Sequence, residues 1–338
     1  MTAFSDILTP TKAGLYCPPG DFYIDPVRQV DRAVVTHGHA DHARAGHGAV
    51  LATRETLAIM ASRYGANFTL SQQAAALGER HNIGDATVWL APAGHVLGSA
   101  QAVVECKGVR IVVSGDYKRR RDPTCARFEP VPCDVFVTEA TFALPVFRHP
   151  DDAGELAKAL RMLEVFPERC VLLGAYSLGK AQRLIGLARE AGHDAPIYLH
   201  GAVEKLCTLY ESLGVRLGEL RSATKAEKSE MQGHLIVAPP QSLNDKWSRR
   251  LPDPIAAFAS GWMRVRARAR QRGVELPLIV SDHADWDELT STIEEVDPEE
   301  VWVTHGREDA LVHWAGTQGI NARPLSLVGY DEEGGGHG

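Results

Sequence analysis

The sequence predicts an α/β fold in which two β-sheets are covered by helices and a second α/β domain is inserted near the middle of the chain. Three observations lead to this prediction. Short runs of β-branched residues repeatedly end in a polar residue, as buried strands do. Stretches with apolar residues three and four positions apart lie between these runs. The polar strand ends fall into two groups, one before residue 148 and one after residue 272.

Composition indicates a soluble globular protein. The chain has 338 residues, of which 44% are hydrophobic and 23% charged, so it can form one large domain or two medium ones with complete cores. The net charge of −7 argues against a protein that coats nucleic acid by bulk electrostatics. The net charge does not exclude a local basic groove. Such a groove could be formed by residues 118–121 or by the arginines at 264, 266, 268, 270 and 272.

No apolar run is long enough to span a bilayer, and the N-terminal residues resemble no signal peptide. The six cysteines are scattered without a C-x-x-C pair, which favours reduced, buried thiols. We therefore expect a cytoplasmic protein.

The predicted strands lead into residues that can bind a metal or carry a proton. Because a rigid sheet holds its strand ends in place, such positions suit a preorganised site. The runs are 33–42 (AVVTHGHADH), 110–116 (RIVVSGD), 134–140 (DVFVTEA), 278–283 (LIVSDH) and 301–306 (VWVTHG).

Helical periodicity is clearest at 152–166, 180–191 and 204–213. These helices lie in a region that lacks site-like strand ends, and we interpret 148–272 as the inserted domain. Residues 1–147 and 273–330 would form the first domain, and 331–338 (DEEGGGHG) a disordered tail.

The densest candidate site is the segment 36–42, T-H-G-H-A-D-H. Imidazole and carboxylate are the side chains with which zinc is most often bound outside thiolate sites. His37 and His39 are two residues apart and can face one ion, whereas Asp41 and His42 can turn to a second. Such a cluster after a β-branched strand predicts a metal site.

Single residues elsewhere complete the predicted metal set. His95 lies between glycines that allow close backbone approach, and Asp116 follows a strand where its carboxylate can bridge two metals. His305 is a further ligand candidate. Asp25 is better suited to orienting a histidine than to binding the metal.

Glu139 and His283 also follow predicted strands. A glutamate that holds a histidine as imidazolium would make a general acid for a leaving oxygen. Capping or packing roles remain the alternative for each.

The order of these motifs resembles the β-CASP branch of the metallo-β-lactamase superfamily, which contains nucleases such as RNase J, Artemis and the pre-mRNA 3′-end endonuclease. The motifs are T-H-G-H-A-D-H, A-G-H-V-L-G-S-A, S-G-D, T-E-A-T, S-D-H-A-D and V-T-H-G. Four further segments are similar to bacterial ligase-associated DNA exonucleases: G-D-F-Y-I-D-P, S-G-D-Y-K-R-R-R-D-P-T, G-A-Y-S-L-G-K-A-Q-R and G-W-M-R-V-R.

This resemblance implies an αββα sandwich with a β-CASP insert, and roles for the site residues. His37, His39 and His95 would bind the first metal, Asp41, His42 and His305 the second, and Asp116 would bridge them. Glu139 and His283 would act on the leaving group. The implied function is a DNA exonuclease in DNA repair, associated with an ATP-dependent DNA ligase and a helicase.

The expected chemistry is attack on a phosphodiester by hydroxide held between two metal ions roughly 3.5–4 Å apart. Nitrogen-rich ligands favour two Zn²⁺ ions, and the carboxylates also suit Mn²⁺. In this scheme Asp41, Glu139 and His283 are the catalytic candidates.

Nucleic-acid contacts are predicted at two further places. If the segment 264–272 were a strand, its arginines, Arg264, Arg266 and Arg268 among them, would form one face for phosphates; as a helix they would spread around it. Ser177 and Lys180 could bind a terminal phosphate at a helix start, or Ser177 could simply cap that helix.

Three rival functions remain. An RNA-processing β-CASP ribonuclease is favoured by His305, since a histidine at this position is typical of the branch's RNA enzymes. A small-ester or lactam hydrolase would need neither Glu139 and His283 nor the insert. A non-catalytic nucleic-acid-binding scaffold would usually have lost ligands, and none is missing here.

Overall fold

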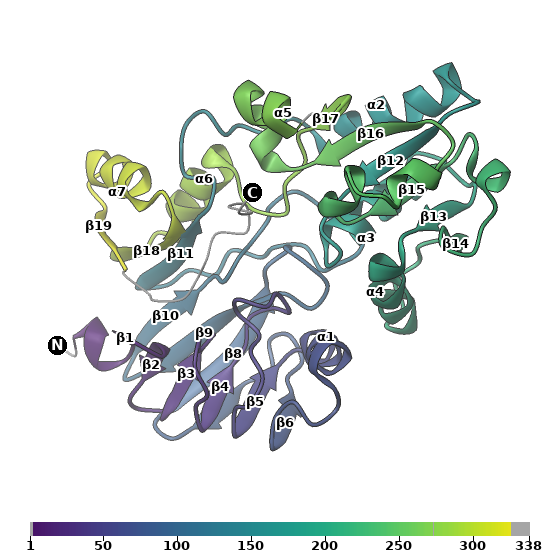
Figure 1. Cartoon of the computed structure of the whole chain (residues 1–338). Coiled ribbons are helices and arrows are strands. Elements are labelled where there is room, and N and C mark those ends of the chain that lie inside the picture. Colours follow the sequence, from purple (N-terminus) through teal and green to yellow (C-terminus); the bar gives the residue numbers. More distant parts are fainter. Residues whose placement is uncertain (1–2, 273, 326–338) are drawn as a thin grey trace. The chain divides into compact units, whose positions relative to one another are not determined.

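The computed structural model describes residues 3–272 and 274–325 (Figure 1), so the predicted tail at 331–338 lies outside the described residues. The chain divides into two compact units, which we describe separately. Unit 1 consists of the described parts of Met1–Arg121, Cys125–Phe147 and His283–Gly338, and unit 2 of Asp122–Thr124 and Arg148–Asp282. In the described ranges no helix has both the length and the apolar character required to cross a membrane.

Unit 1 contains two β-sheets. The first has the strand order β1-β2-β3-β4-β5-β6 and the second β19-β18-β11-β10-β9-β8-β7. The strands of the first sheet are β1 (Thr9–Thr11), β2 (Gly14–Cys17), β3 (Phe22–Ile24), β4 (Arg32–Val34), β5 (Ala49–Ala52) and β6 (Ser71–Ala74). Those of the second are β7 (His81–Ile83), β8 (Ala86–Pro92), β9 (Ala100–Cys106), β10 (Val109–Val113), β11 (Val135–Ala140), β18 (Glu300–Gly306) and β19 (Asn321–Pro324).

The two sheets pack face to face, with helices on their outer faces. Ile24 and Val34 of the first sheet share one apolar core with Val104 of the second. The helices of this unit are α1 (Arg54–Tyr64), α6 (Trp286–Val296) and α7 (Glu308–Thr317). Side chains of α1 share a core with β5, and those of α6 and α7 share one with β11 and β18. Helix, sheet, sheet and helix thus form successive layers, which confirms the predicted αββα sandwich.

Unit 2 is a smaller α/β unit around a parallel sheet of order β14-β13-β15-β12-β16-β17. Buried apolar runs such as Cys170–Gly174 explain its central strands, because parallel strands are covered on both faces. The elements are α2 (Asp152–Val165), β12 (Cys170–Gly174), α3 (Lys180–Glu190), β13 (Ile197–Leu199), α4 (Gly201–Ser212), β14 (Leu220–Ser222), β15 (Leu235–Ala238), β16 (Pro254–Ala259), α5 (Arg266–Arg272) and β17 (Leu276–Leu278). Short 3₁₀ turns are η1 (Phe4–Asp6) in unit 1 and η2 (Lys228–Met231), η3 (Pro240–Leu243), η4 (Ser248–Arg250) and η5 (Gly261–Arg264) in unit 2.

Unit 2 extends to Asp282, beyond the predicted end of the insert at 272. The reason is β17, which pairs in parallel with β16 and so belongs to the sheet of unit 2. The sequence suggested that the run 278–283 returns to the first domain, but only His283 and the residues after it do so. Sequence pattern could not reveal this, since strand pairing is a long-range contact.

Candidate metal centre

The candidate ligands gather at one edge of the sheets in unit 1. Strands β10, β11 and β18 run parallel, so their carboxyl ends meet at the same edge. Asp116 follows β10, and Glu139 and His305 lie near the ends of β11 and β18. The loops after β4 and β8 supply the remaining histidines: His37, His39, His42 and His95.

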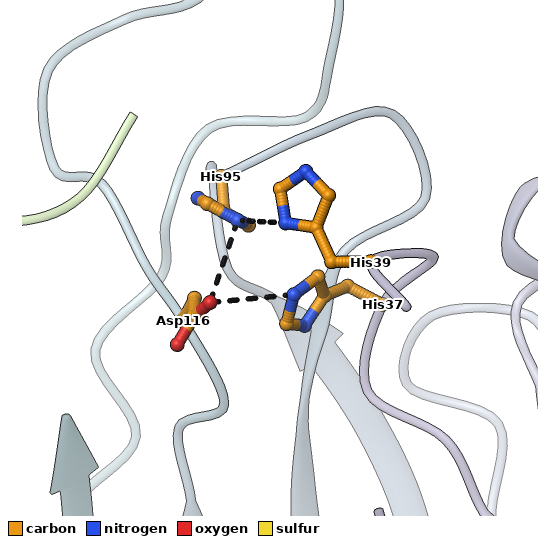
Figure 2. Close-up of side chains that lie close together, drawn as sticks. All are labelled: His37, His39, His95 and Asp116. Carbon is orange, nitrogen blue, oxygen red and sulfur yellow. Dashed lines mark hydrogen bonds and ion pairs between the residues drawn. The ribbon is translucent and has the colours of Figure 1, made fainter. Parts of the chain in front are cut away.

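Four of these side chains form a compact, buried group (Figure 2). One ligand atom each from His37, His39, His95 and Asp116 lies within 4.8 Å of the other three. Asp116 Oδ2 is 3.4 Å from His37 Nε2 and 3.7 Å from His95 Nε2, and His95 Nε2 is 2.9 Å from His39 Nδ1. Figure 2 shows the rings of His37 and His95 directed at this carboxylate.

This donor set fits a divalent metal ion. Three imidazoles and one carboxylate match the ligands that zinc takes in proteins. His37 Nε2 is fully buried and has no hydrogen-bond partner among the described residues. A buried ring nitrogen without such a bond is costly unless something else engages it. The first predicted ligand group is therefore assembled by the fold and compatible with metal binding.

The second predicted group is looser. His42 Nε2 lies 3.6 Å from Asp41 Oδ2 and 3.5 Å from Asp116 Oδ2. The ring of His305 lies 5.1 Å from that of His42. Asp116 Oδ2 is thus close to histidines of both groups.

Burial and charge determine the protonation of these ligands. Burial lowers the pKa of His37 well below its usual value, and with the charge of His42 it lowers the pKa of His305 to about 3. Burial alone would also lower the pKa of His42, but Asp116, Asp41 and Asp25 outweigh it and raise that pKa to about 10. Neutral imidazoles offer lone pairs, and the carboxylates attract positive charge to a place that a divalent cation could fill.

Asp25 contacts both His42 and Thr36. The contact with His42 agrees with the suggestion that Asp25 orients a histidine. Asp25 Oδ2 is 2.8 Å from His42 Nδ1 and accepts a hydrogen bond of 2.5 Å from Thr36 Oγ1. Its Oδ1 accepts from the backbone N–H of Thr36 at 2.8 Å. Asp25 and His305 both have positive φ, 44° and 56°, a sparsely populated conformation that clusters at functional sites.

Glu139 and His283 form a pair beside the candidate metal ligands. His283 Nδ1 is 2.9 Å from Glu139 Oε2 and 4.0 Å from Asp116 Oδ2. The other carboxylate oxygen, Glu139 Oε1, accepts a hydrogen bond from the backbone N–H of Tyr117 at 2.9 Å. Both side chains are buried, at 1% and 8% exposure. One ligand atom each of Asp116, Glu139 and His283 also lies within 4.8 Å of the other two, so a role of His283 as metal ligand is the alternative to a role as acid.

Residues that sequence reasoning missed support the site. Ser99 Oγ accepts from the backbone N–H of His95 at 3.0 Å and fixes that loop. The fully buried Lys118 lies 3.2 Å from the carbonyl oxygen of His283. A lysine followed by three arginines resembles a solvated basic surface, and nothing in the sequence indicated that its first member points inward.

Three of the four residues at 118–121, which could have supplied a local basic groove, are paired within the protein. Lys118 is buried, Arg119 forms an ion pair with Glu295 at 2.5 Å, and Arg120 forms one with Asp285 at 2.6 Å. Such internal pairing leaves these three side chains little charge to offer to phosphate.

Of the two conformations left open for 264–272, the structure has the helical one. Arg264 ends the 3₁₀ turn η5, and Arg266 and Arg268 lie in helix α5. The guanidinium of Arg268 stacks over the Trp262 ring at 4.0 Å. Alternate positions of a helix do not share a face, so the single basic face expected of a strand does not form.

At the start of α3, Gly179 rather than Ser177 is the N-cap residue, so the proposed capping by Ser177 is wrong. Lys180 is buried, with its Nζ 3.4 Å from Asp282 Oδ2 and 5.0 Å from the centre of the Tyr176 ring. Both of these contacts lie within unit 2. Phosphate contacts of Ser177, Lys180, Arg264, Arg266 and Arg268 stay predictions.

Comparison with known proteins is consistent with a metal-binding site at this position. Residues 25–175, which include most of the candidate ligands, match the metallo-beta-lactamase superfamily. This segment of the chain is a domain of that superfamily. The metallo-β-lactamase-fold chain is also 29% identical to the "Probable DNA ligase" of Opitutus terrae over 315 residues, which cover 89% of this chain and 30% of that protein.

Other relatives have names from RNA processing. The "Cleavage and polyadenylation specificity factor 73" of Drosophila melanogaster is 30% identical over 34% of the metallo-β-lactamase-fold chain and 18% of its own length. The "Endoribonuclease YSH1" of Mycosarcoma maydis is 28% identical over 53% of this chain and 25% of its own length. These matches confirm the resemblance to β-CASP nucleases. The chain spans less than a third of the length of each of these three relatives.

A solved structure has the same fold. A protein of unknown function from Enterococcus faecalis V583 superposes with a TM-score of 0.55 at 14% identity. The likeness covers 88% of the metallo-β-lactamase-fold chain and 80% of that protein. At this identity the match concerns the fold alone.

Proposed function

We propose that the protein is a metal-dependent phosphodiesterase that degrades DNA from a strand end and acts in DNA repair. The observation that carries this proposal is the placement of Asp116. Its Oδ2 lies 3.4, 3.5 and 3.7 Å from nitrogens of His37, His42 and His95, and the Glu139–His283 pair adjoins it. A carboxylate among several imidazoles, next to a proton donor, is suited to hydrolysis of a phosphodiester.

Some of the site residues would bind metal, and others would transfer a proton. His37, His39 and His95 would bind one ion, Asp41, His42 and His305 a second, and Asp116 both. Bound divalent ions would acidify water and offset the charge on the phosphate. Two Zn²⁺ ions suit this nitrogen-rich set, and Mn²⁺ is the alternative.

His283 would protonate the leaving oxygen. With Nδ1 held by Glu139 at 2.9 Å, the ring presents Nε2 as the second donor of an imidazolium. The proton moves to the 3′ oxygen as the phosphorus–oxygen bond breaks, so that the other product carries a 5′-phosphate.

DNA is proposed as the substrate because the match that extends over 89% of this chain is to a protein called "Probable DNA ligase". A segment similar to this chain thus lies inside a longer protein with a ligase name. We infer a functional association with a DNA ligase, and the motif resemblance adds an ATP-dependent ligase and a helicase as partners.

An RNA-processing nuclease is the second candidate. His305 favours it, as does the similarity to a protein called an endoribonuclease. A nuclease that distinguishes ribose from deoxyribose does so through a contact to the 2′-hydroxyl.

The decisive experiment compares turnover on single-stranded DNA and RNA of equal length, each with free or blocked ends, in Zn²⁺ and in Mn²⁺. We expect faster degradation of DNA, dependence on a free end, and no cleavage of a circular single strand. Faster cleavage of RNA would support the second candidate. Lack of cleavage of any nucleic acid in either metal would refute the phosphodiesterase proposal itself.

A further inference from the structure

One buried charge has no part in the chemistry proposed above. Lys118 is 0% exposed, and its Nζ lies 3.2 Å from the carbonyl oxygen of His283 and 3.3 Å from Glu288 Oε2. Removing an ammonium group from water destabilises the folded protein unless good partners compensate. A neutral side chain of similar size would avoid this cost, so the contact with the backbone of His283 calls for an explanation.

The segment that carries Lys118 connects the metal ligands to the Glu139–His283 pair. It begins at Asp116. The next residue, Tyr117, donates its backbone N–H to Glu139 Oε1 at 2.9 Å and accepts the N–H of Ala284 at 2.7 Å through its carbonyl oxygen. The N–H of Lys118 then bonds to the carbonyl oxygen of Ala93, two residues before His95, at 3.0 Å.

The partner of Lys118 is itself held firmly. Glu288 Oε1 accepts the backbone N–H of Arg120 at 3.0 Å, and Oε2 accepts that of Asp285, also at 3.0 Å. Arg120 Nη2 lies 2.6 Å from Asp285 Oδ2. These contacts connect the start of α6 to residues 118–120. The loop that carries His283 therefore has hydrogen-bonded neighbours both before and after it in space.

We propose that Lys118 is a positioning residue for His283. Its ammonium fixes the backbone carbonyl of His283, so that the imidazole held by Glu139 keeps one orientation toward the leaving oxygen. This inference rests on the proposed function, in which His283 protonates that oxygen. A displacement of about 1 Å at a reacting group can cost on the order of 10²-fold in rate.

The test uses leaving groups that differ in their need for a proton. The probes are a single-stranded DNA oligonucleotide, whose 3′ alkoxide must be protonated, and the 4-nitrophenyl ester of thymidine 5′-phosphate, whose nitrophenolate leaves without a proton. Lys118→Met removes the ammonium but keeps the length of the side chain. We expect it to lower kcat on DNA by about 10- to 100-fold and kcat on the ester by less than about threefold, at unchanged metal content.

Arg119→Met is the matched control. It removes a cation from the same segment, but that cation contacts Thr292 and Glu295 rather than the His283 loop. We expect both substrates to be turned over at the rate of the unmodified protein. Equal losses on both substrates in Lys118→Met, or no loss on DNA, would overturn the inference.

Two further variants keep the test decisive. If Lys118→Met does not fold, Glu288→Gln weakens the hold on the ammonium with little change of shape, and it should lower the ratio of DNA to ester turnover. An unchanged ratio in that variant would overturn the inference. His283→Ala distinguishes failure of the Lys118 inference from failure of the proposed mechanism. If this variant lowers kcat on DNA and kcat on the ester equally, His283 is not the acid. The proposed mechanism then fails, whatever the effect of Lys118→Met.

Discussion

Asp116 is the residue on which the site converges, because one carboxylate oxygen faces histidines of both predicted ligand groups. Burial raises the pKa of this carboxyl group to about 7, although the neighbouring His42 and His283 oppose the shift. A group that is costly to ionise in isolation becomes a strong ligand once positive charge is placed beside it. Here the electrostatics of individual side chains favour occupation by a cation.

The first prediction separates an acid from a ligand. His283→Ala should lower turnover on DNA by about 10²- to 10⁴-fold, the usual contribution of a general acid, while metal content stays near that of the unmodified protein. Glu139→Gln should have a smaller effect in the same direction, since the amide still accepts a hydrogen bond from His283. Kinetics and metal analysis of the same preparations provide the check. Loss of metal together with activity in His283→Ala would identify this residue as a ligand.

The second prediction concerns Asp25, which holds His42 from behind. Asp25→Asn keeps the shape of the side chain but removes its charge, and an amide N–H directed at Thr36 or His42 would disturb that contact. Comparable changes behind metal-binding histidines lower metal affinity by about 10- to 100-fold. Competition with a chromogenic chelator measures this affinity. An unchanged affinity would mean that Asp25 serves only the fold of the β3–β4 region.

At the scale of elements, helix α1 supports both ligand loops. Thr53 Oγ1 and Thr56 Oγ1 donate to the carbonyl oxygen of Gly98 at 2.6 and 3.0 Å, in the loop that carries His95. At the other end of α1, Arg63 Nη1 donates to the carbonyl oxygen of Gly38 at 2.7 Å, between His37 and His39. A helix that packs on the outer face of the first sheet thus also fixes the loops that extend from both sheets.

The third prediction tests this support at Gly98. The residue has a φ of +79°, and an added Cβ would lie 2.5 Å from Glu55 Cβ and 2.8 Å from the backbone nitrogen of Thr56. Gly98→Ala should therefore destabilise the protein by more than the roughly 1–2 kcal/mol of left-handed strain alone, and it should weaken metal binding by moving His95.

Gly108→Ala is its control, because Gly108 has a similar φ of +81° but no atom within 4 Å of an added Cβ. It should carry the left-handed strain without the steric clash, and metal affinity should not change. Chemical unfolding and chelator competition measure both quantities. Equal behaviour of the two variants would show that packing of α1 against the His95 loop does not matter for the site.

For the whole molecule, the candidate metal centre draws its residues from both sheets of unit 1. His37 follows a strand of the first sheet, while His95 and Asp116 follow strands of the second. An ion bound by all three would therefore stabilise the sandwich in addition to any role in chemistry. A ligand that binds only the folded state adds about 2.7 kcal/mol when its concentration is a hundred times its dissociation constant.

The fourth prediction follows from this linkage. Removal of metal with a chelator should lower the melting temperature, and addition of Zn²⁺ should restore it. The same addition to His37→Ala should give a much smaller shift, since one ligand of the compact group is lost. Thermal melts of both proteins with and without Zn²⁺ measure the effect. Identical melting temperatures with and without metal would argue against binding of metal by the folded site.

Local pattern by itself determined the fold class and the composition of the site. β-branched runs that end in His, Asp or Glu predict strands with chemistry at their ends, because the alternation and the strand length are local properties of the chain. The helices expected at 152–166 and 180–191 correspond to α2 and α3 within a residue. Residue type and spacing likewise predict His37, His39, His95 and Asp116 as candidate ligands, whereas the division of the ligands between two ions is what the family resemblance implies.

Only the tertiary structure decided which charges face inward and where the second unit ends. Lys118 and Lys180 belong to polar segments, yet each is buried against a carboxylate distant in the sequence, Glu288 and Asp282. β17 joins unit 2 through a partner strand, and 266–272 is a helix although alternating arginines also suit a strand. These outcomes depend on ion pairs and strand pairings between residues far apart in the chain, and no local pattern encodes such partners.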